Sequence, residues 1–226
     1  APPGTLVISE VLINPKAVSD EFGEWFEIYN PGDVCVPLGG MVIADGAVDL
    51  HVIGGDTLFV PPKGVVVLGP NGDVTKNGNV KVDYVYNNFL LGNLSDSIII
   101  KTNIGGVLDE VKWQFPVIDP AQKQFEWPMI DLDGKAANLS ADNLEAKAND
   151  IWQSPLGVPV WCLAPTQWQS DPGTGQLTGD YGSPGKANAL CPKPPDGDKD
   201  GVPDEKDNCP NTENLDQADG DKDGVG

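Results

Sequence analysis

The sequence predicts an all-β fold, a sandwich of two sheets, followed by an acidic extension at the C-terminal end. The 27 glycines and 21 prolines favour a chain with many turns. Apolar residues recur in short runs with period-two alternation, as in VKVDYVY at 80–86, and few stretches have the period of a helix. An apolar content of 39% in 226 residues is sufficient for one substantial core.

The stretch 23–33 (GEWFEIYNPGD) is predicted to be the central strand of the main domain. Alternation places Phe26 and Ile28 on one face and Trp25 and Glu27 on the other, so at least one face must be core. Further strands are expected, in chain order, at 5–13, 34–37, 40–44, 50–53, 58–60, 65–68, 80–86, 97–102 and 107–113, the last two forming a hairpin. Short strands at this spacing are typical of an immunoglobulin-like sandwich.

The charge of the chain argues against nucleic acid as a partner. All 14 basic residues are lysines, and the formal net charge is −20. Arginine supplies the bidentate grip on phosphates, and an acidic surface repels a polyanion. No run of about 18 apolar residues is present, so we expect no membrane insertion.

The four cysteines, Cys35, Cys162, Cys191 and Cys209, are an even set without a CxxC pair. Two disulfides in an oxidising compartment are therefore expected, with three connectivities open. The start, Ala1-Pro-Pro-Gly, has no charged or apolar leader region. We expect a secreted protein, extracellular or at the cell surface, whose signal peptide has been removed.

Five blocks of the first 190 residues together resemble the bacterial lamin tail domain. They are ISEVLINP (8–15), GEWFEIYNPG (23–32), PLGGMVIADG (37–46), DSIIIKTNIGGVLDEVKW (96–113) and DYGSPGKAN (180–188). The resemblance implies an immunoglobulin-like β-sandwich over residues 1–190, used as an accessory module of secreted bacterial proteins, sometimes beside hydrolases. It departs from the family at 125–127 (FEW), where relatives often carry a Leu-Glu-Arg-like stretch.

Residues 114–179 match that pattern only loosely and are expected to form a tryptophan-rich insertion with structure of its own. Its four tryptophans are Trp127, Trp152, Trp161 and Trp168. They would pack the insertion onto the sandwich or, as an alternative, stack on sugar rings as a ligand-binding surface. One or two helical turns are expected within 139–148, with Ser140 as N-cap.

A calcium-binding loop is predicted at 196–207 (DGDKDGVPDEKD), after a proline-rich linker that begins at Cys191. Positions 1, 3, 5, 9 and 12 are aspartates and position 6 is a glycine: Asp196, Asp198, Asp200, Asp204, Asp207 and Gly201. Calcium requires six to eight oxygen ligands, and alternate carboxylates converge only where a glycine lets the chain bend. The carbonyl of Val202, at position 7, would complete the set.

The whole of 191–226 resembles a thrombospondin type 3 repeat, a fold that wraps around its ions and has almost no apolar core. A second, truncated run supplies Asp219, Asp221 and Asp223 as further expected ligands. The resemblance implies that Cys191 pairs with Cys209, which would leave Cys35 for Cys162. Without calcium the segment is expected to be disordered.

No catalytic motif is present, so we expect a protein that is not an enzyme. His51 is the single histidine and is expected on a strand surface. A glycosidase pair among Glu24, Glu27 and Glu110 is the alternative that the sequence leaves open.

The sequence thus favours a non-catalytic extracellular protein, a β-sandwich for binding or assembly carried on a calcium-stiffened stalk. Calcium is the expected cofactor, and a protein or glycan ligand or further copies of the chain are the expected partners. Two alternatives remain: a structural subunit of an extracellular filament or surface layer, joined through open sheet edges, and a carbohydrate-binding accessory module of a secreted hydrolase.

Overall fold

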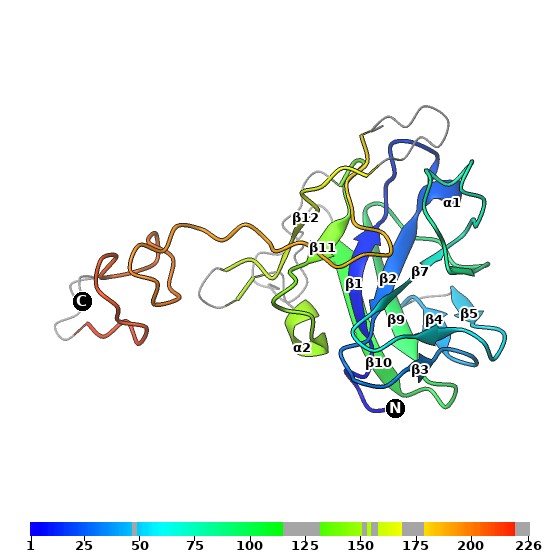
Figure 1. Ribbon diagram of the computed structural model, residues 1–226, viewed down its shortest axis with the longest axis horizontal. Coiled ribbons are helices and arrows are strands. Elements are labelled where there is room, and N and C mark those ends of the chain that lie inside the picture. The colour runs from blue at the N-terminus through cyan, green and yellow to red at the C-terminus, as the bar shows by residue number, and fades with distance from the viewer. Residues whose placement is uncertain (47–48, 115–131, 151–152, 155–157, 169–178, 220–226) are drawn as a thin grey trace.

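The computed structural model describes residues 1–46, 49–114, 132–150, 153–154, 158–168 and 179–219. In these ranges the chain forms twelve strands and two one-turn helices (Figure 1). Their bounds are β1 Val7–Leu12, α1 Asp20–Gly23, β2 Trp25–Tyr29, β3 Val36–Pro37, β4 Val42–Ala44, β5 Leu50–Val52, β6 Phe59–Val60, β7 Val65–Gly69, β8 Tyr84–Val85, β9 Ser95–Lys101, β10 Val107–Gln114, β11 Ala137–Leu139, α2 Ala146–Asn149 and β12 Trp161–Leu163.

The strands form two main sheets that pack face to face as an immunoglobulin-like β-sandwich, which confirms the predicted fold class. One sheet has the order β12-β11-β1-β2-β7-β8 and the other β10-β9-β4-β5, while β3 and β6 form a separate pair. Neighbouring strands are antiparallel except β7 and β8. The core lies between the sheets and contains Phe26 and Ile28 from β2 opposite Ile98 and Ile100 from β9.

The expected central strand is β2, which lies inside the six-stranded sheet between β1 and β7. Phe26 and Ile28 face the sandwich core, as predicted. The other face is also covered, since Trp25 joins a second apolar cluster with Leu12, Val67 and Ala164. The sheet is therefore buried on both sides at its centre, a feature more typical of parallel sheets than of a simple sandwich.

Most strands of the first 114 residues form where the alternation predicts them, including the β9–β10 hairpin. The exception is 80–86, which contributes only the two residues of β8. The segment bends instead of extending, because the amide of Val82 donates to the carbonyl of Val80 and that of Asp83 to Val67. Its alternating pattern reflects burial of Val80 and Tyr86 rather than a long strand.

The region expected as an insertion adds strands to the sandwich. β11 pairs with β1, and β12 pairs with β11, so residues 137–139 and 161–163 extend the six-stranded sheet. One helical turn, α2, forms at the end of the range 139–148, but it begins at Ala146, so the assignment of Ser140 as its N-cap is wrong. Ser140 instead donates its hydroxyl to Asp142 and its amide to Val160, since Leu139 just before it is in a strand.

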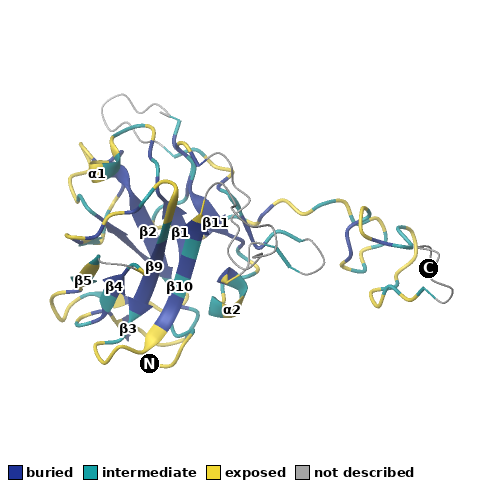
Figure 2. Cartoon of the chain, turned by 180° about the vertical axis from the view of Figure 1, so that it is seen from behind, coloured by how far each residue is buried: buried dark blue, intermediate teal, exposed yellow. Residues whose placement is uncertain are grey.

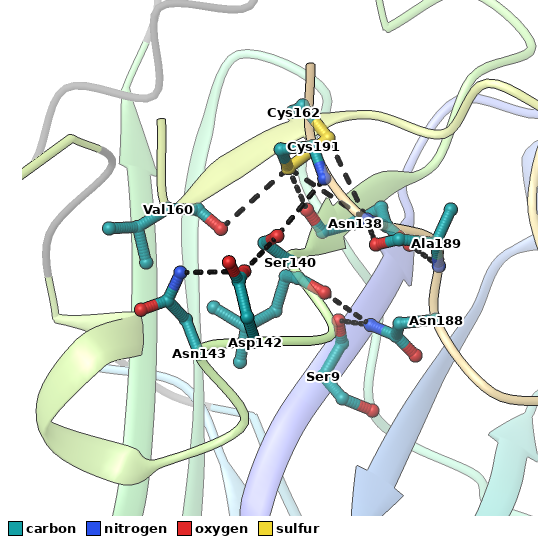
Figure 3. Close-up of a disulfide and its surroundings, with 11 residues drawn as sticks. Ser9, Asn138, Ser140, Asp142, Asn143, Val160, Cys162, Asn188, Ala189 and Cys191 are labelled. Carbon is teal, nitrogen blue, oxygen red and sulfur yellow. Dashed lines mark hydrogen bonds between the residues drawn. A yellow bond between two sulfur atoms is a disulfide. The ribbon is translucent and has the colours of Figure 1, made fainter. Parts of the chain in front are cut away.

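The cysteine pairing implied by the repeat is also wrong, since Cys162 forms a disulfide with Cys191 (Figure 3). Asn138 of β11 is the physical reason: it lies opposite Cys162 in the sheet register, and its side-chain amide exchanges two hydrogen bonds with the backbone of Ala189. Asn138 of β11 thus positions both cysteines, whose Cα atoms lie 5.6 Å apart. Cys35, expected to pair with Cys162, is exposed and lies outside this disulfide.

Beyond Cys191 the chain leaves the sandwich as an extended segment and ends in the loops of the acidic tail (Figures 1 and 2). Lys193 forms an ion pair with Asp142, with 2.7 Å between its ammonium nitrogen and the carboxylate, where the linker departs. Figure 2 shows that buried residues dominate the sandwich and are sparse in the tail. None of the helices that the structure describes is long and apolar enough to cross a bilayer.

Candidate functional site

Three carboxylates of the tail converge. Oxygen atoms of Asp196, Asp198 and Asp200 all lie within 4.8 Å of one another. Two ligands of one calcium ion are at most about 5 Å apart, because each lies 2.3–2.6 Å from the ion. The geometry therefore fits a single Ca²⁺ contacted by loop positions 1, 3 and 5.

Backbone amides of the loop hold these carboxylates in place. Asp196 accepts from the amides of Lys199, at 2.7 Å, and Gly201, at 3.1 Å. Asp200 accepts from the amide of Val202 at 2.8 Å. The turn requires the glycine at position 6, since Gly201 has a φ of +95°, which residues with a side chain rarely adopt. The loop is thus organised so that its carboxylates face inward.

Asp207, at position 12, has a carboxylate oxygen whose surroundings suggest a bound cation. The residue is 9% exposed, yet Oδ2 has no hydrogen-bond partner among the described residues, whereas Oδ1 accepts from the amide of Cys209 and the side chain of Gln217. Oδ2 of Asp198 is buried without a partner as well. Burial raises the pKa of Asp198, and the carboxylates of Asp200, Asp207 and Asp196 raise it further. Buried carboxylate oxygens without donors are costly to keep charged, and a bound cation would offset that cost.

The remaining predicted ligands divide into three groups. Asp204 is in the loop, where it accepts from the amide of Gly197, and Val202 is buried in the tail. Asp219 is described but does not join the cluster of Asp196, Asp198 and Asp200. Asp221 and Asp223 lie outside the described residues. The first loop is therefore the candidate metal centre.

A second group of carboxylates is buried in the sandwich and was missed by the sequence reasoning as a set. Glu10 of β1 and Glu27 of β2 are register partners on adjacent strands, and both are fully buried. Glu10 accepts from the amide and hydroxyl of Ser183, at 2.9 and 2.7 Å, and Glu27 accepts from the amide of Gly185. The pair therefore fastens the returning segment 183–185 to the outer face of the sheet.

Burial controls the protonation of these two acids. It raises the pKa of Glu10 to about 7, against the lowering effect of the hydrogen bonds from Ser183. It raises the pKa of Glu27 as well, and the charge of Glu10 adds to this effect. Two carboxylates on adjacent strands cannot both be charged at low cost, so the pair retains a proton near neutral pH. Alternation places these acids on the face opposite Phe26 and Ile28, so the local sequence carried no signal that a later segment would bury them.

The suggested glycosidase pair does not form. Glu24 is buried, accepts from the amide of Leu91 at 3.2 Å, and has its pKa raised to about 8, chiefly by burial. Glu27 is committed to Gly185, and Glu110 of β10 forms an ion pair with Lys112 at 2.7 Å. Glu27 and Glu110 lie on different sheets, and no two of the three acids line a common pocket among the described residues.

Asp109 and His51 also have structural partners. Asp109 of β10 accepts from the amide of Ile8 and from the side chain of Asn149, each at 2.6 Å, and so ties the two sheets together where β1 has a bulge. Burial raises its pKa to about 7. His51 is part of β5, as expected, with Nε2 2.8 Å from the hydroxyl of Tyr84.

The tryptophans expected to bind ligand differ in their surroundings. Trp161 is 1% exposed and donates from Nε1 to the carbonyl of Asn149, so it is core and its assignment as a ligand contact is wrong. Trp168 is half-buried and packs its edge against Trp25, with ring centroids 5.9 Å apart. Trp127 and Trp152 lie outside the described residues.

Comparison with known families gives one match. The family model of the lamin tail domain matches residues 1–115, a range that ends one residue after β10. Lamin tail domains are non-enzymatic and immunoglobulin-like. No curated protein matches the chain.

Proposed function

The chain belongs to the lamin tail domain family, and from that premise we propose that it is a non-catalytic extracellular protein whose β-sandwich is a binding or assembly module on a calcium-stabilised stalk. The family is immunoglobulin-like and suggests such a module. The stalk is the segment 196–219, which resembles a thrombospondin type 3 repeat. A disulfide and an immunoglobulin-like domain are compatible with an extracellular location.

The observation that carries the proposal is the unpartnered oxygen of Asp207. Asp196, Asp198 and Asp200 alone would be an acidic cluster of a kind common on protein surfaces. Asp207 closes the same loop at position 12, it is buried, and its charge acts on Asp198. A cation would stabilise an anionic oxygen that has no donor among the described residues, and hard oxygen ligands favour Ca²⁺.

The ion would also explain how the stalk keeps its shape. Very few of its residues are buried, among them Val202 at 1% exposure, so apolar burial contributes little. Hydrogen bonds from Asn214 to Asp200 and from Gln217 to Asp207 connect the second half of the segment to the carboxylates of the loop. Binding of Ca²⁺ would fix those carboxylates and, through them, the rest of the stalk.

The test is calorimetric titration of the full chain with CaCl₂, comparing Asp207→Asn with Asp216→Asn. The amide oxygen of the Asp207→Asn variant can still accept the hydrogen bonds of Cys209 and Gln217, so the substitution removes only the second anionic oxygen. We expect Asp207→Asn to weaken calcium binding by at least about tenfold, since a ligand charge is lost.

Asp216 is the matched control because it is exposed and equally acidic. Its substitution should change the affinity by less than about twofold, the effect of one screened surface charge. Equal affinity of Asp207→Asn and the unaltered chain, or the absence of any calcium binding, would contradict the proposal.

A further inference from the structure

The sandwich has a pocket on the outer face of its six-stranded sheet, beside Trp168. Its volume is about 520 Å³, within the range of small-molecule sites. Three segments surround it: the turn at 79–81, residues 166–168, and residues 182–189, which include the segment 183–185 described above. No residue of the tail loop 196–207 lines it, so the pocket is separate from the candidate metal centre.

One wall is an aromatic surface held in a fixed position. The Nε1 of Trp168 donates to the carbonyl of Gly78 at 3.0 Å, and its ring rests against Trp25. Gly182 allows this close packing, because a Cβ there would lie 3.0 Å from Trp25 and 3.1 Å from Trp168. An indole fixed before binding loses little freedom when a ring stacks on it.

The opposite wall is also held in place by buried contacts. Ser183, which lines the pocket, donates both its amide and its hydroxyl to the buried Glu10. Asn188, just beyond, donates to the carbonyls of Ser9 and Leu139, at 2.7 and 2.8 Å. The segment that forms this wall is therefore tied to the sheet along its length.

The charge of the pocket is opposite to that of the protein. Two lysines, Lys81 and Lys186, line it, and none of the described lining residues is acidic, although the chain has a net charge of −20. Asp83 is 3.7 Å from the ammonium of Lys81 but does not line the pocket. Thr166 and Gln167 add a hydroxyl and an amide. A positive pocket on an acidic surface selects an anion.

We propose that this pocket binds an acidic saccharide, a sugar residue that carries a carboxylate such as a uronic acid. The apolar face of the sugar ring would pack on Trp168, the carboxylate would lie between Lys81 and Lys186, and Thr166 and Gln167 would meet the hydroxyls. The inference rests on the proposed role of the sandwich as a binding module and is independent of calcium in the stalk.

The test uses the full chain and two soluble oligosaccharides of equal length, one built of glucuronate and the other of glucose. Titrations are followed by calorimetry and by the indole N–H resonance of Trp168 in a nitrogen-edited NMR spectrum, assigned with Trp168→Phe. We expect the acidic saccharide to bind and shift that resonance, with binding that weakens as salt is raised. The neutral one should bind at least about tenfold more weakly, since it lacks the charge-assisted contacts.

The discriminating variant is Lys81→Ala/Lys186→Ala, which removes exposed side chains and leaves the fold intact. It should weaken binding by about tenfold or more, whereas the control pair Lys63→Ala/Lys101→Ala, away from the pocket, should not. Binding should persist in a chelator, so failure of the stalk proposal would leave this result unchanged. Equal binding of both saccharides, equal loss in both lysine pairs, or no shift of the Trp168 resonance would overturn the inference.

Discussion

The sandwich and the acidic tail both bring carboxylates out of water, but they neutralise them in different ways. In the sandwich, Glu10, Glu24 and Asp109 are buried among apolar side chains and backbone amides, and burial raises their pKa values to about 7, 8 and 7. In the tail, Asp196, Asp198 and Asp200 meet near the surface, with Asp207 beneath them. A buried acid, alone or in a pair, can keep a proton, whereas three acids that converge near the surface favour a cation.

The comparison shows which interaction stabilises each region: apolar burial in the sandwich and hydrogen bonds to aspartates in the tail. The sandwich has a continuous apolar core that includes Trp113 and Trp161, so its carboxylates are a minor cost within a large favourable burial. The tail has no comparable core among its described residues and is organised by hydrogen bonds to aspartates. The two regions should therefore respond independently to core mutations, reduction, pH and calcium removal.

The largest effect should come from the core. Trp161→Ala should lower the free energy of unfolding of the sandwich by about 3–5 kcal/mol, the usual cost of removing a buried aromatic side chain, and also leaves the carbonyl of Asn149 without its donor. Urea unfolding monitored by fluorescence measures this. The calcium affinity of the tail should stay unchanged, and Val34→Ala, at a side chain 72% exposed, should change neither quantity.

The disulfide comes next, because it closes the point at which the stalk leaves the sandwich. Cys162→Ala/Cys191→Ala should lower the stability of the sandwich by about 3.6 kcal/mol, the chain-entropy value for a loop with a sequence separation of 29. Chemical denaturation with the tail saturated with calcium provides the measurement. A loss of calcium affinity without a loss of sandwich stability would contradict the assignment of this disulfide to the sandwich.

A smaller effect for each pH unit is expected from the buried acids. Glu24 has a pKa of about 8 in the folded chain and near 4.5 when unfolded, so between these values the folded state holds a proton that the unfolded state has released. Its stabilising contribution is complete below about pH 4.5 and is lost as pH rises toward 8, by about 1.4 kcal/mol for each pH unit at most.

Glu24→Gln should flatten this dependence, since glutamine does not titrate, whereas Glu21→Gln at an exposed position should not. Unfolding free energies measured from pH 5 to pH 8 at constant calcium decide the matter. Stability that rises over this range would contradict the protonated state of the buried acids.

The smallest effect should be that of Gly201→Ala in the tail. A φ of +95° is strained for alanine, by about 1 kcal/mol, so calcium affinity should fall about fivefold while the stability of the sandwich does not change. Glu205→Ala, an exposed position in the same loop, is the control. Equal affinities of the two variants would indicate that the turn at position 6 does not organise the ligands.

Local patterns predicted the part of the fold that depends on neighbouring residues. Alternation in 107–113 and the turn before it were sufficient for the β9–β10 hairpin, and the spacing of Asp196, Asp198 and Asp200 was sufficient for their convergence. Local patterns could not place β11 and β12, because each has only three residues. β11 is defined by pairing with β1 across more than a hundred positions, and β12 by pairing with β11.

The same limit explains the cysteines and the buried acids. Cys191 lies close in sequence to the tail, but its position is set by Asn138 and Ala189, contacts that no sequence pattern announces. Glu10 gave the appearance of a solvent-facing strand residue until segment 183–185 covered it. In each case a distant segment folds back and changes the environment of a residue whose local sequence predicted another role.

The central claim, that a divalent cation organises the tail while the sandwich folds without one, is tested most directly by amide hydrogen exchange of the full chain in calcium and in chelator. The amides of Lys199, Gly201 and Val202, which donate to the carboxylates of Asp196 and Asp200, should be protected with calcium and exchange freely without it. Amides of β1 and β2 should be equally protected in both conditions. Protection of the tail amides that survives the chelator would contradict the account.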